Sequence, residues 1–235
     1  MSHERLIYVA LGDSIATGCL TYWASTDGYP AYIARALARR RPVQLQNHAV
    51  NGDTSGRLLW RLTHCQGLRR AIAQAGLITL SIGGNDLLHA ASIPGFTSIC
   101  SAKAWYGVNQ FLQNYPRIIA EIRSLNRQAP LIAMTIYNPY CCSQNLGGAF
   151  CDRGLHEFTE RCLAGINQLI ETNTCDGYMV ADVHSAFARY RFGRMGRVVA
   201  LYPADGCFLL RNPHPTPCGH RLIAREHLKA LDFTR

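Results

Sequence analysis

Short apolar runs of strand length alternate along the chain with longer segments of helical periodicity. The runs fall at 6–11, 43–47, 76–82, 130–137 and 178–183. Between them lie segments whose apolar residues recur every three or four positions, at 29–40, 54–74, 103–128, 154–173 and 217–231. This alternation is typical of a parallel sheet with helices on both faces. Continuous apolar runs also indicate strands that are buried on both sides. We therefore expect an α/β fold.

Several features of this pattern make finer predictions. The segment 54–74 is expected to break near Gly67, and the segment 103–128 to bend at Pro116. Residues 138–153 and 184–213 carry no clear period and are expected to form loops. The chain of 235 residues contains no internal repeat, low-complexity tract or linker. We expect one domain that covers residues 1–235.

The composition is that of a globular protein, with 48% hydrophobic and 17% charged residues. No apolar run approaches the roughly 20 residues that a membrane-spanning helix needs, so no integral membrane segment is expected. Residues 1–5 lead directly into the first strand, which leaves no room for a signal peptide. We expect a cytoplasmic protein, although a secreted protein whose leader had been removed would look the same.

The chain is basic, with 24 Lys and Arg against 15 Asp and Glu and a net charge of +9. The basic residues are scattered, as at 39–41, 69–70 and 189–197, which favours a solvated surface. No nucleic-acid-binding motif accompanies them, so no nucleic-acid partner is expected. Attraction to anionic lipid or to acidic substrates is the alternative.

Ten cysteines are present, but none is spaced as in a CxxC zinc motif, and no metal is expected. Their even number permits disulfide bonds, for which the region from Cys141 to Cys162 is the best placed. Cysteine also packs as a small hydrophobic residue, so free thiols are the alternative.

A serine follows the first strand within Gly12-Asp13-Ser14. Active sites of parallel α/β sheets lie at the carboxyl ends of the strands, where a serine on a tight turn exposes its hydroxyl. A nucleophile needs that exposure and a nearby base. Taken alone, the motif is more typical of a helix N-cap, because Asp and Ser are preferred there.

Two further motifs follow the second and third strands. Asn51-Gly52 is a turn sequence whose glycine can present its backbone N–H, and Gly83-Gly84-Asn85 adds an amide donor. Such donors stabilise the oxyanion of a tetrahedral intermediate. Ordinary turns that lead into helices are the alternative interpretation of both.

His214 stands between Pro213 and Pro215, just before the last helical segment. The prolines stiffen the backbone on either side of the ring. An imidazole beside the serine would act first as general base and then as general acid to the leaving alcohol. A surface histidine is the alternative.

Taken together and in this order, the four motifs resemble the signature blocks of the SGNH hydrolases, also called GDSL esterases and lipases. Ser14, Gly52, Asn85 and His214 match the block residues, and the surroundings match at 9–14, 82–86 and 214–220. The resemblance runs from residue 8 to residue 224. It implies a flavodoxin-like, three-layer α/β/α sandwich with a five-stranded parallel sheet.

The resemblance also implies the chemistry. Ser14 would attack a carboxylic ester, with His214 as base, and form an acyl-enzyme. The oxyanion hole would consist of the N–H groups of Ser14 and Gly52 and the side chain of Asn85. No metal or organic cofactor is implied, and the partner is a small-molecule ester of esterase, lipase or lysophospholipase type.

The chain departs from the family where the acid of the triad is usually found. Positions 211 and 212, three and two residues before the histidine, are Arg and Asn rather than Asp. An acceptor is still needed to orient the imidazole. We favour the side chain of Asn212 or the carbonyl of Arg211, with Asp205 or Asp182 as the alternative. A neutral acceptor predicts modest turnover or a preference for activated esters.

Asp13 and Asp86 flank two of the site residues and are interpreted as carboxylates that hold loops through backbone N–H groups. The segments 88–105 and 138–153 are expected to wall the acyl pocket. Their apolar and aromatic residues, together with the adjoining Tyr106 and Tyr137, are Ile93, Phe96, Ile99, Trp105, Tyr106, Tyr137, Tyr140 and Phe150.

These walls favour a lipophilic acyl group. The alternatives are a sugar-ester deacetylase, an acyltransferase or a scaffold of this type that only binds. The sequence makes no prediction of the oligomeric state.

Overall fold

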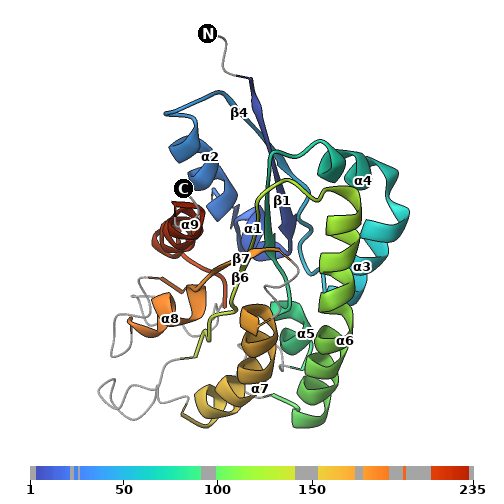
Figure 1. Ribbon diagram of the computed structural model, residues 1–235. Coiled ribbons are helices and arrows are strands. Elements are labelled where there is room, and N and C mark those ends of the chain that lie inside the picture. Colours follow the sequence, from blue (N-terminus) through green and yellow to red (C-terminus); the bar gives the residue numbers. More distant parts are fainter. Residues whose placement is uncertain are drawn as a thin grey trace.

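A computed structural model describes residues 4–21, 24–25, 27–90, 99–140, 153–172, 177–190, 198–199 and 213–232. Its centre is a sheet of five parallel strands in the order β4-β1-β5-β6-β7 (Figure 1). The strands are β1 (Leu6–Gly12), β4 (Val43–Asn47), β5 (Leu77–Ser81), β6 (Leu131–Met134) and β7 (Met179–Ala181). This is the flavodoxin-like strand order, in which the chain reverses direction across the sheet between β1 and β5. The expected α/β class is confirmed.

Helices cover both faces of this sheet (Figure 1). One layer holds α2 (Tyr29–Leu37), α8 (Val183–Ala188) and α9 (Pro217–Asp232). The other holds α3 (Ser55–His64), α4 (Gln66–Ala73), α6 (Ser101–Leu125) and α7 (Arg153–Thr172). Two short helices, α1 (Ser14–Thr17) and α5 (Gly84–Leu88), follow β1 and β5, and a small hairpin joins β2 (Cys19–Thr21) to β3 (Ala24–Ser25). The three-layer sandwich is therefore confirmed.

Alternation within the central strands divides the core between the two helix layers. Val9 and Leu11 of β1 pack with the layer of α3, α4, α6 and α7, whereas Tyr8 and Ala10 pack with the layer of α2, α8 and α9. Every residue of β5 is buried, as its continuous apolar run predicts. The edge strand β4 is only half-buried because it pairs with β1 alone among the described strands.

The helices depart from the sequence predictions in a few places. The break within 54–74 falls at Cys65 rather than near Gly67, because the extended backbone of Cys65 ends α3 and begins α4. Helix α6 starts at Ser101 and continues through Pro116. Helices α5 and α8 were not predicted, since each is too short to show a period. Among the described residues, no helix is long and apolar enough to cross a membrane.

Cys162 is a free, buried thiol that packs with the apolar residues between α6 and α7. The expectation of a disulfide is thus wrong for Cys162, which behaves as the small hydrophobic residue of the alternative. Cys141, Cys142 and Cys151 lie outside the described residues.

Candidate active site

Ser14 begins helix α1 directly after β1, at the carboxyl edge of the sheet. Gly12, two residues before it, has a φ of 138°, and a Cβ there would lie 2.1 Å from the carbonyl oxygen of Ser81, so only glycine fits. Asp13 supplies the cap of α1, accepting the N–H of Ile15 at 3.0 Å. The motif thus does contain a helix N-cap, as the alternative interpretation expected, but the cap is Asp13, and the hydroxyl of Ser14 is left for another partner.

That partner is His214, which lies 200 positions further along the chain. Its Nε2 is 2.7 Å from Oγ of Ser14. Burial lowers the pKa of His214 to about 4, which keeps the ring neutral at physiological pH. A neutral Nε2 can accept the proton that the hydroxyl donates, as a general base must.

The loop that carries His214 is fixed on both sides of the ring. Tyr137, just after β6, is buried and donates its hydroxyl to the carbonyl oxygen of Pro213 at 2.6 Å. The Tyr137 ring stacks on Phe187 of α8, with 4.3 Å between the centroids. On the other side, the N–H of Thr216 donates to the carbonyl of Val198 at 2.9 Å. Sequence reasoning placed Tyr137 in a pocket wall but missed its bond to the histidine loop.

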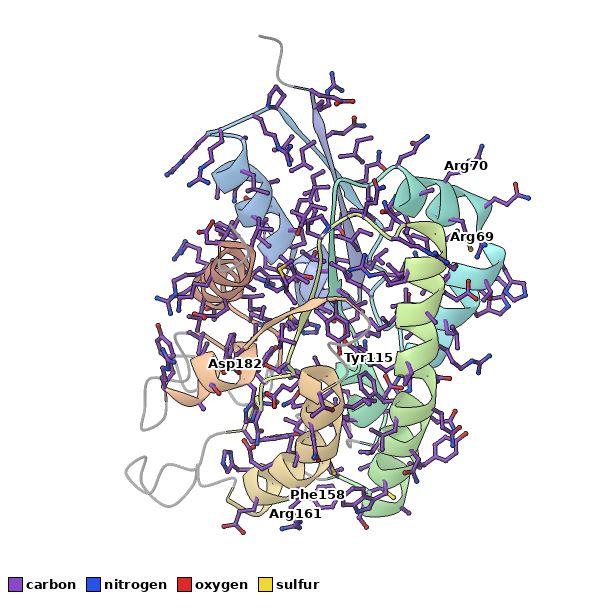
Figure 2. All side chains as sticks on the ribbon, in the orientation of Figure 1. Arg69, Arg70, Tyr115, Phe158, Arg161 and Asp182 are labelled. Atoms are coloured by element: carbon purple, nitrogen blue, oxygen red, sulfur yellow. The ribbon has the colours of Figure 1, made fainter. Side chains whose placement is uncertain are left out.

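Of the four residues proposed to orient the imidazole, Asp182 lies in the described part of the structure. Arg211, Asn212 and Asp205 lie outside the described residues. Asp182 follows β7 and caps α8, where its carboxylate accepts the N–H of Ser185 at 3.0 Å (Figure 2). Within the described part of the chain, the bonds of this carboxylate go to α8 and Thr135 and not to His214. The structure therefore contradicts Asp182 as the orienting group.

Gly52 sits in a turn that lies against the end of β1 and the end of α1. The N–H of Val50 donates to the carbonyl of Gly12 at 3.0 Å, and the Thr17 hydroxyl donates to the side chain of Asn51 at 2.5 Å. Gly52 has a φ of 77°, which strongly favours glycine. Among the described backbone groups, its N–H donates to no carbonyl. It is therefore available to a substrate oxygen.

Asn85 presents an amide in the pocket that Ser14 also lines. It lies in α5, is 8% exposed and shares a pocket wall with Ser14. One N–H of its amide donates to the carbonyl of Asp53 at 2.8 Å, which fixes the orientation of the side chain. The amide carries a second N–H, so it can hold this bond and still donate to an oxyanion. The structure thus brings Ser14, Asn85 and His214 together, with the turn of Gly52 beside them.

Residues 10–222 match the model of the GDSL-like lipase/acylhydrolase family. The chain belongs to this family. A curated relative, the uncharacterized protein YpmR of Bacillus subtilis (strain 168), is 29% identical over 140 residues. The match covers 58% of this chain and 53% of YpmR, so the chain spans about half the length of the curated relative it matches.

Solved structures of similar fold include two lipases and an esterase. The lipase Lip_vut3 from a goat rumen metagenome has a TM-score of 0.69 at 18% identity, covering 96% of this chain and 97% of that chain. An extracellular lipase of Streptomyces rimosus has the same TM-score and identity, with 98% and 100% covered. An acetylxylan esterase of Geobacillus stearothermophilus has a TM-score of 0.62 at 18% identity, with 96% and 94% covered. Likeness at these identities shows the shared fold.

In this GDSL-like domain, a buried polar framework holds the loops that carry Gly52 and Asn85. The Ser55 hydroxyl and N–H donate to the carboxylate of Asp86 at 2.6 and 3.0 Å. The guanidinium of Arg61 contacts the buried carboxylate of Asp53 at 2.5 Å. Sequence reasoning missed Ser55 and Arg61, because neither stands in a recognisable motif.

Asp13 and Asp86 were expected to hold loops, and both accept backbone N–H groups as predicted. Burial, with repulsion from Asp86 and Asp53, raises the pKa of Asp13 to about 7. Burial also raises the pKa of Asp86, against the lowering effect of the bonds from Ser55. Within the described ranges, no three His, Cys, Asp or Glu side chains are grouped as metal ligands would be.

A pocket of about 820 Å³, its mouth included, opens beside Ser14. Its polar residues include Ser14, Asn85 and His214, while most of its wall is apolar. The apolar wall comes from α1, α5, β6, α6 and α7 and from segments next to β5, β6, α6 and His214, namely Ile15, Ile82, Leu87, Leu88, Ile99, Ala104, Met134, Ile136, Tyr137, Pro139, Tyr140, Phe158, Cys162, Leu163 and Pro213.

Of the expected wall residues, Ile99, Tyr137 and Tyr140 are confirmed. Trp105 and Tyr106 instead point to solvent. Ile93, Phe96 and Phe150 lie outside the described residues.

Proposed function

We propose that this GDSL-like protein hydrolyses carboxylic esters through an acyl-enzyme on Ser14. The observation that carries the proposal is the 2.7 Å contact between a neutral, partly buried imidazole and the serine hydroxyl. As Ser14 Oγ attacks the ester carbonyl, its proton passes to Nε2 of His214. The same proton then goes to the leaving alcohol, and water repeats the sequence to release the acid. The reaction balances without a metal or an organic cofactor.

The oxyanion formed in each half of the reaction needs donors that are in place beforehand. We assign this role to the N–H groups of Ser14 and Gly52 and to the amide of Asn85. Support comes from the bond between Asn85 and the carbonyl of Asp53, since it fixes the amide without using both of its hydrogens. One such donor contributes about 2.7–4 kcal/mol to lowering the barrier.

The other nitrogen of the imidazole needs an acceptor that holds the correct tautomer. We propose the side chain of Asn212 for this role, with the carbonyl of Arg211 as the second candidate. Substituting Asn212 and Asp205 one at a time by Ala distinguishes a neutral acceptor from a carboxylate. Loss of activity in Asp205→Ala with retention in Asn212→Ala would exclude the side chain of Asn212 and favour a carboxylate.

The pocket favours esters with a lipophilic acyl chain. Its apolar wall matches alkyl carbons, whereas a sugar ester would require hydrogen-bonding side chains along the same surface. With one leaving group and acyl chains of increasing length, kcat/KM should rise from acetate to medium chains. A maximum at acetate would favour the deacetylase alternative instead.

The reaction itself is tested by comparing ester hydrolysis by wild type, Ser14→Ala and His214→Ala. Ser124→Ala and His64→Ala are matched controls, because both residues are exposed and belong to helices α6 and α3. We expect loss of activity only in the first pair. Equal rates in all variants would exclude Ser14 and His214 as the catalytic residues, and a folded wild type without hydrolysis would favour a scaffold that only binds its ligand. Faster transfer to an added alcohol than to water would identify an acyltransferase.

A further inference from the structure

Two large aromatic side chains stand in solvent at the start of helix α6. Trp105 is 43% exposed and Tyr106 is 67% exposed. Among the described residues, the third exposed large hydrophobic side chain is Trp60 of α3, which stacks on His64 with 4.9 Å between the rings. Burying a tryptophan and a tyrosine would gain considerable free energy, so their exposure as neighbours indicates a surface that meets a partner.

The exposed pair adjoins the acyl pocket. The ring of Trp105 meets the edge of the Phe158 ring of α7, with the centroids 6.3 Å apart at 76°. Phe158 lines the pocket, as does Ala104, the residue before Trp105. Figure 2 shows Phe158 near the start of α7 with Arg161 beside it. Trp105 thus contacts a residue of the pocket wall that would hold an acyl chain.

Two cationic residues accompany these aromatic rings on α6 and α7. The guanidinium of Arg161 lies 5.6 Å from the centre of the Phe158 ring, and Lys103 is exposed one turn from Tyr106. The first twenty residues of α6, from residue 101 to 120, contain Lys and Arg but no Asp or Glu. Glu157, an exposed acidic residue, precedes Phe158 in α7. The chain as a whole carries a net charge of +9.

We propose that the aromatic patch, defined as Lys103, Trp105, Tyr106, Phe158 and Arg161, docks on the surface of an anionic lipid bilayer. Tryptophan and tyrosine rings favour the headgroup level of a membrane, and each cation near an anionic surface adds attraction. A second copy of this chain fits the patch less well, because it would bring the same cations and the same net charge. Docking would bring the pocket wall to the lipids that carry its substrate.

Vesicle binding tests the docking surface without catalysis. The Ser14→Ala protein, with and without Trp105→Ser and Tyr106→Ser, is mixed with vesicles of phosphatidylcholine alone or with phosphatidylglycerol, and the bound fraction is measured by sedimentation. Trp60→Ser is the matched control, an exposed tryptophan on another helix. We expect the double substitution to weaken binding to anionic vesicles at least about tenfold, and Trp60→Ser to leave it unchanged.

The charge of the patch makes a second prediction. Lys103→Glu with Arg161→Glu should weaken binding to the anionic vesicles on the order of tenfold or more, with little effect on neutral ones. Raising the salt concentration should weaken anionic binding in the same way. Equal binding of the two kinds of vesicle by the parent protein would overturn the proposal.

The consequence for catalysis rests on the proposed ester hydrolysis and is measured separately. In the active enzyme, Trp105→Ser with Tyr106→Ser should leave hydrolysis of a soluble nitrophenyl ester unchanged but lower hydrolysis of an ester embedded in anionic vesicles. Unchanged vesicle binding by the double variant, or loss of binding in Trp60→Ser alone, would overturn the docking surface. A shift of the double variant to a smaller size in gel filtration would do the same and assign the patch to a second copy.

Discussion

Tyr137→Phe removes one oxygen atom, the hydroxyl that holds the histidine loop. The hydroxyl donates to the carbonyl of Pro213 at 2.6 Å in a buried place, next to His214. Phenylalanine keeps the ring and its stack on Phe187, but the carbonyl of Pro213 loses its partner. An unpaired buried acceptor costs about 1–3 kcal/mol. For a domain of this size, each kcal/mol lowers the melting temperature by roughly 2–4 °C.

Catalysis should suffer more than stability in this variant. The bond fixes the residue before His214, and displacement of a catalytic group by about 1 Å can cost 10²-fold in rate. We therefore expect kcat on a nitrophenyl ester to fall about 10- to 100-fold with a small change in KM. Steady-state kinetics and thermal unfolding followed by circular dichroism measure the two effects on the same sample.

Tyr178→Phe is the matched control. The buried hydroxyl of Tyr178 also donates to a backbone carbonyl, that of Ile170 on α7, at 2.5 Å. This variant should lose comparable stability and keep its kcat. If kcat fell equally in both variants, or if Tyr137→Phe kept full activity while losing stability, Tyr137 would have no special part in placing His214.

Three other predictions follow from the site and its buried histidines. Asn85→Ala should lower kcat by roughly 10²- to 10³-fold at unchanged stability, and a loss below about fivefold in steady-state assays would remove Asn85 from the oxyanion hole. Because burial lowers the pKa of His214 to about 4, the rate should fall in acid with a midpoint near pH 4, and a midpoint near 6.5 would contradict a buried neutral base. Burial likewise lowers the pKa of His220 and His227 to about 4, so the unfolded chain, with its ordinary histidine pKa near 6.5, binds more protons between these values. The free energy of unfolding should therefore decrease as the pH falls below about 6.5, by on the order of 3 kcal/mol for each residue at pH 4, and urea denaturation that shows no such decrease would refute it.

The sequence predicts the sheet well because its strands are buried on both sides. Such strands read as continuous apolar runs, and the motifs that follow them fall at one edge of any parallel sheet. The closeness of Ser14 and Asn85 follows from this rule, since β1 and β5 are neighbours in the sheet. The contact of His214 with Ser14 needed more than local pattern, because it joins two ends of the chain, and it was expected from the family resemblance.

The hydrogen bonds that hold the loops of the site could not be predicted in the same way. Tyr137 meets Pro213 across 76 positions, and Ser55 meets Asp86 across 31. Neither pair has a local signature, since tertiary packing alone brings the partners together. Helices as short as α5 and α8 also have too few residues to show a helical period in the sequence. The position of the break at Cys65 depends on the backbone angles of one residue, which composition does not set.

Covalent labelling of the protein with a fluorophosphonate tests the central claim most directly. The reagent bonds to an activated serine oxygen and displaces fluoride, so intact-mass measurement followed by peptide mapping reports both the number and the place of adducts. We predict one adduct on Ser14 in the wild type, greatly slowed labelling in His214→Ala and none in Ser14→Ala. A folded wild type that stays unlabelled, or an adduct at another serine, would contradict Ser14 as the nucleophile.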